Sequence, residues 1–294
     1  MTPPTRKAPL RVFRHSRTAA PRSDRAARIA VAALFFTNGA LFANLLPRYP
    51  QIKADLDLSN AAYGLAIASF PLGALLAGLA AGVLIRRFRS SRVAVVGTVS
   101  VGIGALLAGI APSWGALATA MFLAGAVDAI TDVAQNSHGL RVQRRYGRSI
   151  INSFHAVWSM GAVSGGLMGG LAASAGMPRG LHLGLSAALF SVVALLAYRF
   201  LLAGPEPLEA VADTARRAQR DPGHATRRTR MLVVLAALVV IGIGGAIVED
   251  AGSTWAAIYL SVDLNASAGI AALGFVALVG FQFVGRLLGD GLVD

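Results

Sequence analysis

Cysteine is absent from the 294 residues, and charged residues are scarce. Without Cys the chain cannot form disulfides, thiolate nucleophiles or thiolate metal sites. Asp, Glu, Lys and Arg make up only 14% of the chain, whereas soluble domains carry about 25%. The shortage of charge therefore argues against a soluble enzyme.

Long apolar stretches fill much of the remaining sequence. Hydrophobic residues make up 55% of the chain, and the mean hydropathy is +0.61. A helix of about 20 mostly apolar residues crosses a hydrocarbon core of roughly 30 Å. Eight stretches are long enough, at 29–46, 61–85, 93–111, 114–134, 150–174, 181–203, 231–248 and 266–288. We predict an all-α, polytopic membrane protein whose first helix is an uncleaved anchor.

The basic residues gather on alternate connections between these stretches. The formal net charge is +13, and 23 of the 27 Lys and Arg lie before residue 29, in the second and fourth connections, or in the sixth connection and the helix end before it. Cationic loops resist translocation and stay in the cytoplasm. We therefore predict that both termini are cytoplasmic. The basic excess is then a topology signal rather than a nucleic-acid site, with attraction to anionic lipid as a secondary contribution.

The longest connection, 204–230, is rich in Pro and charge. Such a composition cannot bury enough apolar surface to offset chain entropy. We predict a cytoplasmic linker there, which separates a basic tail and a six-helix block (1–28 and 29–203) from a two-helix block (231–294). An offset of 208 residues aligns Ser59 with Ser267. If the second block repeats the first, eight of an expected twelve helices are present, and we expect a C-terminally truncated chain.

A motif after the second stretch resembles the loop signature of the major facilitator superfamily, Gly-x-Leu-x-Asp-Arg-x-Gly-Arg. Arg86 replaces its Asp and Arg89 replaces its second Gly. The signature positions in the two blocks are Gly82, Arg86, Arg87, Gly289, Asp290 and Asp294. The resemblance implies two six-helix halves joined by a long cytoplasmic loop.

Further motifs are similar to the fucose-permease-like branch of bacterial permeases. They lie at 132–136, at 144–148 and around His155 and Trp158, with Glu249 later in the chain. This resemblance implies a monomeric secondary transporter of the bacterial cytoplasmic (inner) membrane, with two halves rocking about a site at the bilayer midplane. A Walker-type loop is absent, so nothing indicates ATP-driven transport.

The fourth stretch carries carboxylates that a membrane interior disfavours. A charge at a helix centre costs at least about 2.5 to 3.5 kcal/mol, so one that persists usually faces a cavity, a partner or water. Four polar residues at i, i+4, i+7 and i+8 share one helical face: Asp128, Asp132, Gln135 and Asn136. They predict the polar wall of a transport path, with Asp128 as the better candidate for binding a proton or substrate. The alternative is a polar helix end that bonds to neighbouring backbone.

Other helices offer further candidates. Asn152, His155 and Ser159 share a face of the fifth stretch, where a His can titrate near neutrality, and Asn38 lies near the centre of the first. Packing and interhelical hydrogen bonding are equally compatible with these residues. Glu249, near the predicted outer end of the seventh stretch, is preferred over its neighbour because adjacent carboxylates cannot share one helical face.

The resulting prediction is a proton-coupled transporter of a small molecule, with no cofactor and no metal. Asn, Gln and carboxylate side chains suit a sugar or small polar metabolite, whereas three phenylalanines of the first stretch (Phe35, Phe36 and Phe42) suit an amphipathic drug. A non-transporting remnant is one alternative. An intramembrane hydrolase built on Ser164 and His155 is another, although nine residues on one helix separate the two by about 13 Å.

Overall fold

The computed structural model describes residues 22–147, 149–204 and 224–293, and every regular element in these ranges is helical. The helices are α1 (Arg22–Leu45), the 3-10 turn η1 (Leu46–Arg48), α2 (Tyr49–Asp55), α3 (Asn60–Gly78), α4 (Ala81–Phe88), α5 (Ser90–Gly109), α6 (Trp114–Tyr146), α7 (Ile151–Ser174), α8 (Arg179–Tyr198), α10 (His224–Ile258), the π-helical segment η2 (Tyr259–Asp263) and α11 (Ala268–Val293). Most of the predicted tail, the first part of the linker, Arg148 and Asp294 lie outside the described residues.

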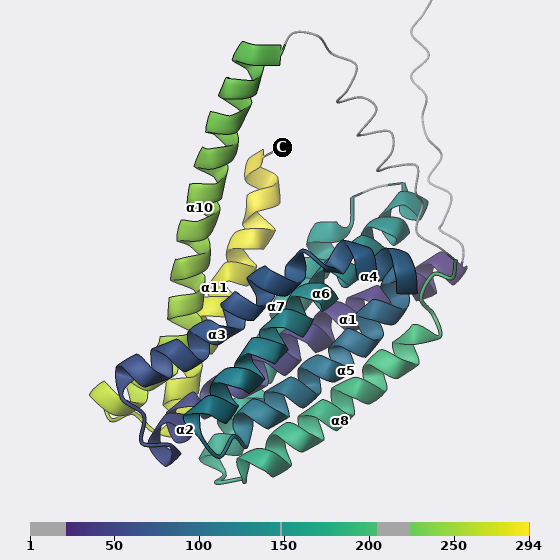
Figure 1. Ribbon diagram of the computed structural model, residues 1–294. Helices are drawn as coiled ribbons and strands as arrows, with labels where there is room; N and C mark the ends of the chain where they lie inside the picture. Colours follow the sequence, from purple (N-terminus) through teal and green to yellow (C-terminus); the bar gives the residue numbers. More distant parts are fainter. Residues whose placement is uncertain (1–21, 148, 205–223, 294) are drawn as a thin grey trace, which may run out of the picture.

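Eight helical segments are long and apolar enough to cross a membrane, as predicted. They are Ser23–Asp55, Asn60–Gly78, Ser90–Gly109, Trp114–Tyr146, Ile151–Ser174, Arg179–Tyr198, Met231–Asp263 and Ala268–Gly285. Figure 1 shows the first six as a bundle of long helices, with α10 and α11 beside it. The protein is therefore an all-α, multi-pass membrane protein.

The ends of several helices differ from the prediction. Helix α6 continues to Tyr146 and stops at Gly147, which caps it in the left-handed conformation at φ 64°. Consequently Arg141, Arg144 and Arg145 lie on a helix, whereas the sequence placed them in a loop. Charged residues can extend a helix beyond the apolar core of a membrane, so hydropathy underestimates its length.

The predicted linker and tail are also shorter than expected. Helix α10 begins at His224, so the last seven residues of the predicted linker are helical, and α1 begins at Arg22 inside the predicted tail. The second predicted span is interrupted, since α3 ends at Gly78 and α4 begins at Ala81. At the end of the chain, Gly289 and Asp290 lie within α11 rather than at the start of a loop.

Glycines allow α1 and α7 to cross at close range. A Cβ atom added to Gly161 would collide with the carbonyl oxygen of Phe36, and one added to Gly165 would collide with that of Ala40. From the other side, Gly39 lies against the carbonyl oxygen of Trp158. Only glycine permits this backbone contact, because any side chain would separate the helices. The crossing fixes the position of α1 in the bundle.

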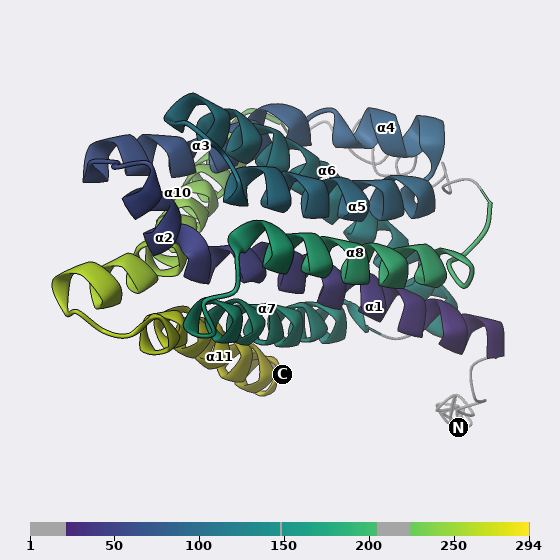
Figure 2. The same ribbon diagram turned by 90° about the horizontal axis from the view of Figure 1, so that it is seen from below.

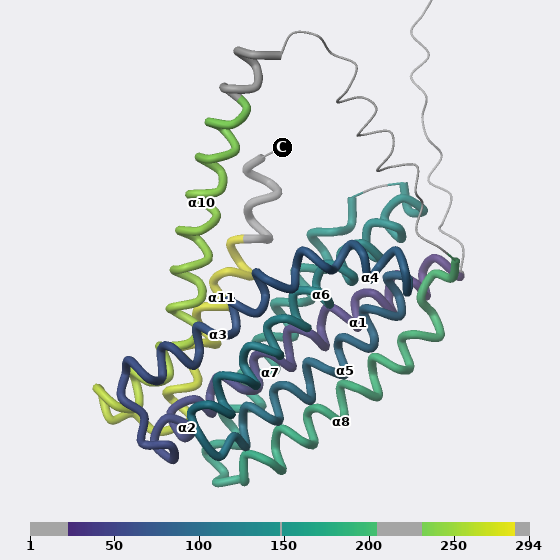
Figure 3. The backbone as a smooth tube through the Cα atoms, in the orientation of Figure 1, coloured from purple at the N-terminus to yellow at the C-terminus, as the bar shows by residue number. Residues whose placement is uncertain are grey.

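Helix α10 contacts the six-helix block at only one end. Tyr63 of α3 donates a hydrogen bond of 2.9 Å to the backbone oxygen of Thr254, and its ring meets Trp255 edge-on at 5.0 Å. Residues 231–248 of α10 are all exposed. Figures 1 and 2 show α10 meeting the block near α2 and α3 and leaning away from it toward the other end, and the tube in Figure 3 follows the same path.

Candidate functional site

A hydrogen-bonded group of three side chains joins α1, α6 and α7. The indole Nε1 of Trp158 donates to Asn38 Oδ1 at 2.7 Å, and Asn38 Nδ2 donates to Asp128 Oδ1 at 2.8 Å. An indole N–H can only donate, so it fixes the orientation of the Asn38 amide, which then presents its NH₂ group to Asp128. The carboxylate is therefore tied to two other helices through one buried amide.

A second group lies one helical turn further along the same elements. Asn136 Nδ2 donates to Asp132 Oδ1 at 3.0 Å, and Asn136 Oδ1 lies 3.1 Å from His155 Nε2. Since the Asn136 oxygen faces the ring, Nε2 of His155 carries the proton. Phe35 of α1 meets the His155 ring edge-on at 5.3 Å. We call the two groups together the three-helix network, which contains Asn38, Asp128, Asp132, Asn136, His155 and Trp158.

Glu249 lies at a position along its span similar to those of Asn38 and Asp128. Asn38, Asp128 and Glu249 each lie about halfway along a 33-residue span. The sequence placed Glu249 near the outer end of its helix, which is wrong because α10 continues to Ile258. Glu249 is half-buried, and its backbone oxygen accepts a hydrogen bond from Ser253 at 2.7 Å.

Two predicted site residues lie apart from the network. Gln135 is fully buried, and its Nε2 donates to Thr98 Oγ1 of α5 at 3.2 Å. The four polar residues at 128, 132, 135 and 136 form a stripe about 100° wide on an ideal helix. The two edges of this stripe face different neighbours: Gln135 reaches α5 and Asn136 reaches α7. Asn152 is exposed on α7, in the helical turn before His155.

Ser159 and Ser164 both donate hydrogen bonds to the backbone of their own helix. Ser159 Oγ donates to the His155 oxygen at 3.2 Å, and Ser164 Oγ donates to the Met160 oxygen at 2.8 Å. The Ser164 hydroxyl proton is thus directed to a carbonyl group rather than to a base. The predicted hydrolase pair is not assembled, because catalysis requires the nucleophile and base within hydrogen-bond reach.

The loop-signature positions of the first block lie on α4. Gly82 is half-buried and Arg86 and Arg87 are exposed. The guanidinium of Arg87 lies over the ring of Phe88 at 5.4 Å. Arg89, which stands where the resembling pattern has Gly, adopts φ 74° and ψ 143°, a conformation that favours glycine.

Sequence reasoning missed a buried cluster at the other end of α1. The fully buried Arg48, expected in a short outer connection, donates from Nε to His182 Nδ1 at 3.4 Å and from Nη1 to Gln51 Oε1 at 2.9 Å. The other His182 nitrogen lies 2.8 Å from Asn44 Oδ1, which also accepts from Ser186. We call Asn44, Arg48, Gln51, His182 and Ser186 the Arg48 cluster. The i, i+4 spacings of Asn44 with Arg48 and of His182 with Ser186 were signals that the sequence offered.

No group of three or more His, Cys, Asp or Glu side chains that could hold a metal ion occurs within the part of the chain that the structure describes. The polar chemistry of the three-helix network is therefore that of carboxylates, amides, one imidazole and one indole. These groups can bind a polar solute through hydrogen bonds, and the two carboxylates can take up and release protons.

The chain matches the model of one protein family. The family model described as Major Facilitator Superfamily matches residues 31–292. An uncharacterized transporter of Sinorhizobium fredii is 30% identical over 264 residues, which cover 90% of this chain and 67% of the relative. An uncharacterized MFS-type transporter of Yersinia pestis is 26% identical, with 88% and 64% covered. The chain thus spans about two thirds of the length of these curated relatives.

Solved structures show the same fold. A D-xylose–proton symporter superposes with a TM-score of 0.63 at 18% sequence identity, over 92% of this chain and 69% of that one. A nucleoside transporter superposes with a TM-score of 0.60 at 14% identity, over 91% and 65% of the two chains. At these identities the likeness extends to the fold alone.

Proposed function

Since the chain belongs to the major facilitator superfamily, we propose that it takes part in secondary active transport of a small polar solute by alternating access, coupled to protons. Membership of this family makes it a transporter that lies in a lipid bilayer. The solute, the proton coupling and the mechanism are the proposal. One observation carries it: a carboxylate halfway through the bundle has an amide as its partner rather than a cation.

Asp128 is the proposed proton-binding group. Among the described residues, no Lys or Arg forms an ion pair with it, and Asn38 donates a hydrogen bond to it. An ionised carboxylate at this depth costs several kcal/mol unless water or a partner compensates. Protonation removes that charge. Proton binding therefore favours the conformational state that binds the proton more tightly, and a shift toward that state raises the affinity for the proton.

The solute site is proposed on the faces of α1, α6 and α7 that carry the three-helix network, with Glu249 of α10 contributing from the other block. Hydroxyl-bearing solutes suit this mixture of amides and carboxylates. The phenylalanines of α1 favour a polar solute over an amphipathic drug, because all three pack against other rings. Their partners are Phe154 for Phe35, Phe190 for Phe36 and Phe70 for Phe42.

Topology completes the proposal. We place both termini in the cytoplasm of a bacterium, on the arginine-rich side of its inner membrane, because cationic connections resist translocation. The six-helix block then forms one half of a monomeric transporter of the fucose-permease-like branch. The linker after residue 204 joins it to α10 and α11, which begin the second half.

A fluorescence titration tests Asp128 without knowledge of the solute. In a variant with Trp114→Phe and Trp255→Phe, Trp158 is the remaining tryptophan. We expect its emission to titrate with pH, because protonation of Asp128 changes the carboxylate that Asn38 links to the indole. Asp128→Asn should abolish this titration, and Asp250→Asn should preserve it. A titration unchanged by Asp128→Asn would overturn the assignment.

Transport itself is tested in proteoliposomes, with a solute identified by screening sugars and small polar metabolites for thermal stabilisation. Asp128→Asn should lose accumulation driven by a pH gradient and retain exchange of solute across the membrane, because exchange requires no net proton movement. Gradient-driven accumulation at the unaltered level would contradict proton coupling through Asp128.

A further inference from the structure

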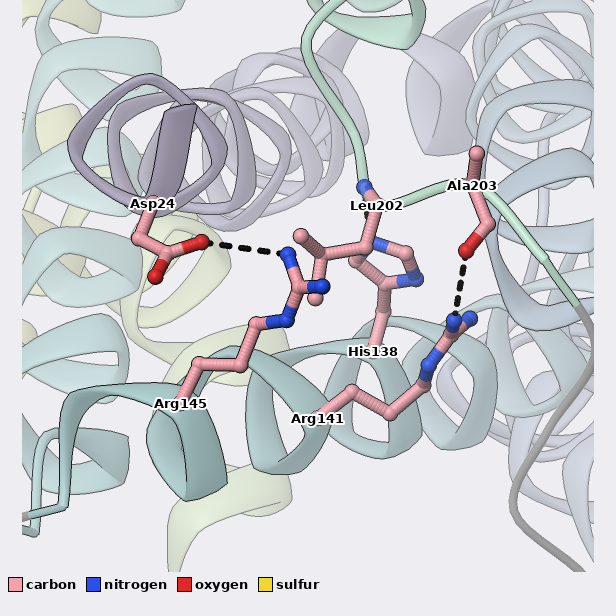
Figure 4. A network of polar contacts seen from close by, with 6 residues as sticks. All are labelled: Asp24, His138, Arg141, Arg145, Leu202 and Ala203. Carbon is pink, nitrogen blue, oxygen red and sulfur yellow. Dashed lines mark hydrogen bonds and ion pairs between the residues drawn. The ribbon is translucent and has the colours of Figure 1, made fainter. Parts of the chain in front are cut away.

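A cavity lined by arginines lies at the end of the bundle where α6 stops. Its volume is about 340 Å³, and its lining consists of Arg141, Arg144, Arg145, Leu202 and Ala203. Figure 4 shows Arg141 and Arg145 extending from successive turns of α6 toward residues 202 and 203, which follow α8. The cavity is at the lower end of the range of ligand-binding sites, about 300 to 1,000 Å³.

Hydrogen bonds hold the wall of this cavity in place. The backbone N–H of Leu202 donates to His138 Nε2 at 3.0 Å, so the proton of this buried imidazole is on Nδ1, which donates to Ser90 Oγ at 2.8 Å. Arg141 Nη2 donates to the backbone oxygen of Ala203 at 3.0 Å. Residues 202 and 203 are thereby fixed to α6 before any ligand binds (Figure 4).

The charge of the lining is strongly positive. Three guanidinium groups face one carboxylate, that of Asp24, which lies 3.1 Å from Arg145 Nη1. Arg141 is buried and Arg144 is exposed, so one cation is pre-positioned and another is free to close on a ligand. Arginine at a helix C-terminus complements the helix dipole, and this accounts for the residue type. It does not account for a cavity whose wall is fixed by hydrogen bonds.

We propose that this cavity binds a phosphate group. Guanidinium forks match the geometry of phosphate oxygens and bond them in pairs. Two sources share this chemistry: the headgroup of an anionic phospholipid at the membrane surface, and a soluble phosphate. In both cases the anion lies between the end of α6 and residues 202 and 203. This inference stands apart from the transport proposal, since it uses none of the residues of the three-helix network.

The test is the thermal unfolding midpoint of the purified full chain in neutral detergent. One arm adds inorganic phosphate against chloride of equal ionic strength, and the other adds short-chain phosphatidylglycerol against phosphatidylcholine. A rise in midpoint with phosphatidylglycerol alone identifies a lipid headgroup, a rise with phosphate alone identifies a soluble source, and a rise with both shows recognition of the shared group. No rise in either arm would overturn the proposal.

A matched pair of variants separates a site from general attraction. Arg144→Gln should raise the half-maximal ligand concentration about tenfold, because charge-assisted bonds to the anion are lost. Arg92→Gln removes the same charge from an exposed position on α5 and should leave that concentration within about twofold. Arg144 is exposed, so its replacement should not impair folding. Equal weakening by both variants would mean attraction without a site and would refute the proposal.

Discussion

The three-helix network and the Arg48 cluster are two groups of polar side chains that both involve helix α1. They differ in composition and in how far their side chains are buried. Both join α1 to other helices through an asparagine, Asn38 in one and Asn44 in the other. The network contains two carboxylates, and Asp132 is exposed. The Arg48 cluster contains no carboxylate, and Asn44, Arg48, His182 and Ser186 are all buried.

The difference separates a group suited to exchange of partners from one suited to holding helices together. Carboxylates can take up and release protons, and they can accept hydrogen bonds from a solute or from an amide. A sealed cluster has no such freedom, and Arg48 even retains one buried guanidinium nitrogen, Nη2, without a hydrogen-bond partner. We therefore expect changes in the network to affect transport first, and changes in the Arg48 cluster to affect stability first.

The largest effect should come from Gly165→Ala, which would disturb both groups together. The new methyl group would collide with the backbone of Ala40 and push α1 from α7, at a cost of about 3 kcal/mol. The fraction of monodisperse protein in size-exclusion chromatography measures this loss. Gly78→Ala is the matched control, since an added Cβ there meets no atom within 4 Å. Equal yields of the two variants would contradict the close crossing.

His182→Phe should break the Arg48 cluster alone. Arg48 Nε loses its acceptor while remaining buried, which costs about 2 kcal/mol. Thermal unfolding in detergent measures the loss, and transport per folded molecule should be unchanged. Ser186→Ala serves as the control and should cost less than about 1 kcal/mol, because His182 still bonds to Asn44. A transport defect without loss of stability would reverse the roles assigned to the two groups.

Asn38→Ala should break the network with a smaller effect on stability. Both the Trp158 indole and Asp128 lose their partner. Because both side chains are only half-buried, whereas Arg48 is fully buried, water can replace the lost bonds, and the cost is about 1 kcal/mol of unfolding free energy. Gradient-driven transport should fall at least tenfold. The neighbouring Thr37→Val tests specificity, since the Thr37 hydroxyl bonds to the backbone of its own helix. If the two variants transport equally well, the network does not form the site.

The smallest effect is expected for Gln135→Leu, which tests whether the site extends from the network to α5. Thr98 still donates its hydroxyl proton to the Ala94 oxygen after Gln135 is replaced, so no buried donor is left without a partner and stability should change by less than about 1 kcal/mol. Solute uptake should stay within about threefold of the unaltered protein. A tenfold loss of uptake would extend the site to α5.

The transmembrane segments were predictable because lipid imposes a simple requirement of length and polarity. Their ends were not, since charged residues such as Arg141 and Arg145 extend α6 beyond its apolar part, and Gly147 was the better stop signal. Of the helical face predicted on α6, Asp128, Asp132 and Asn136 lie in the network, whereas Gln135 bonds to α5.

The candidate site could be predicted only in part, because its residues pair across long distances in the sequence. Asn38 was a candidate from its central position alone, and its link to Asp128 spans 90 residues. The contact of Arg48 with His182 spans 134 residues, and no local pattern shows which helices are neighbours. Spacing along one helix predicts a face, whereas the partner of that face depends on how the bundle packs.

The contact of Tyr63 with Thr254 and Trp255 joins α10 to α3 at one end of the bundle. Residues 231–248 of α10 are exposed, so no comparable contact holds this part of α10 to the six-helix block. In the proposed alternating-access cycle this contact would have to break, and its strength would set how often the protein visits the opposite state. Each kcal/mol removed from it would shift that occupancy about fivefold.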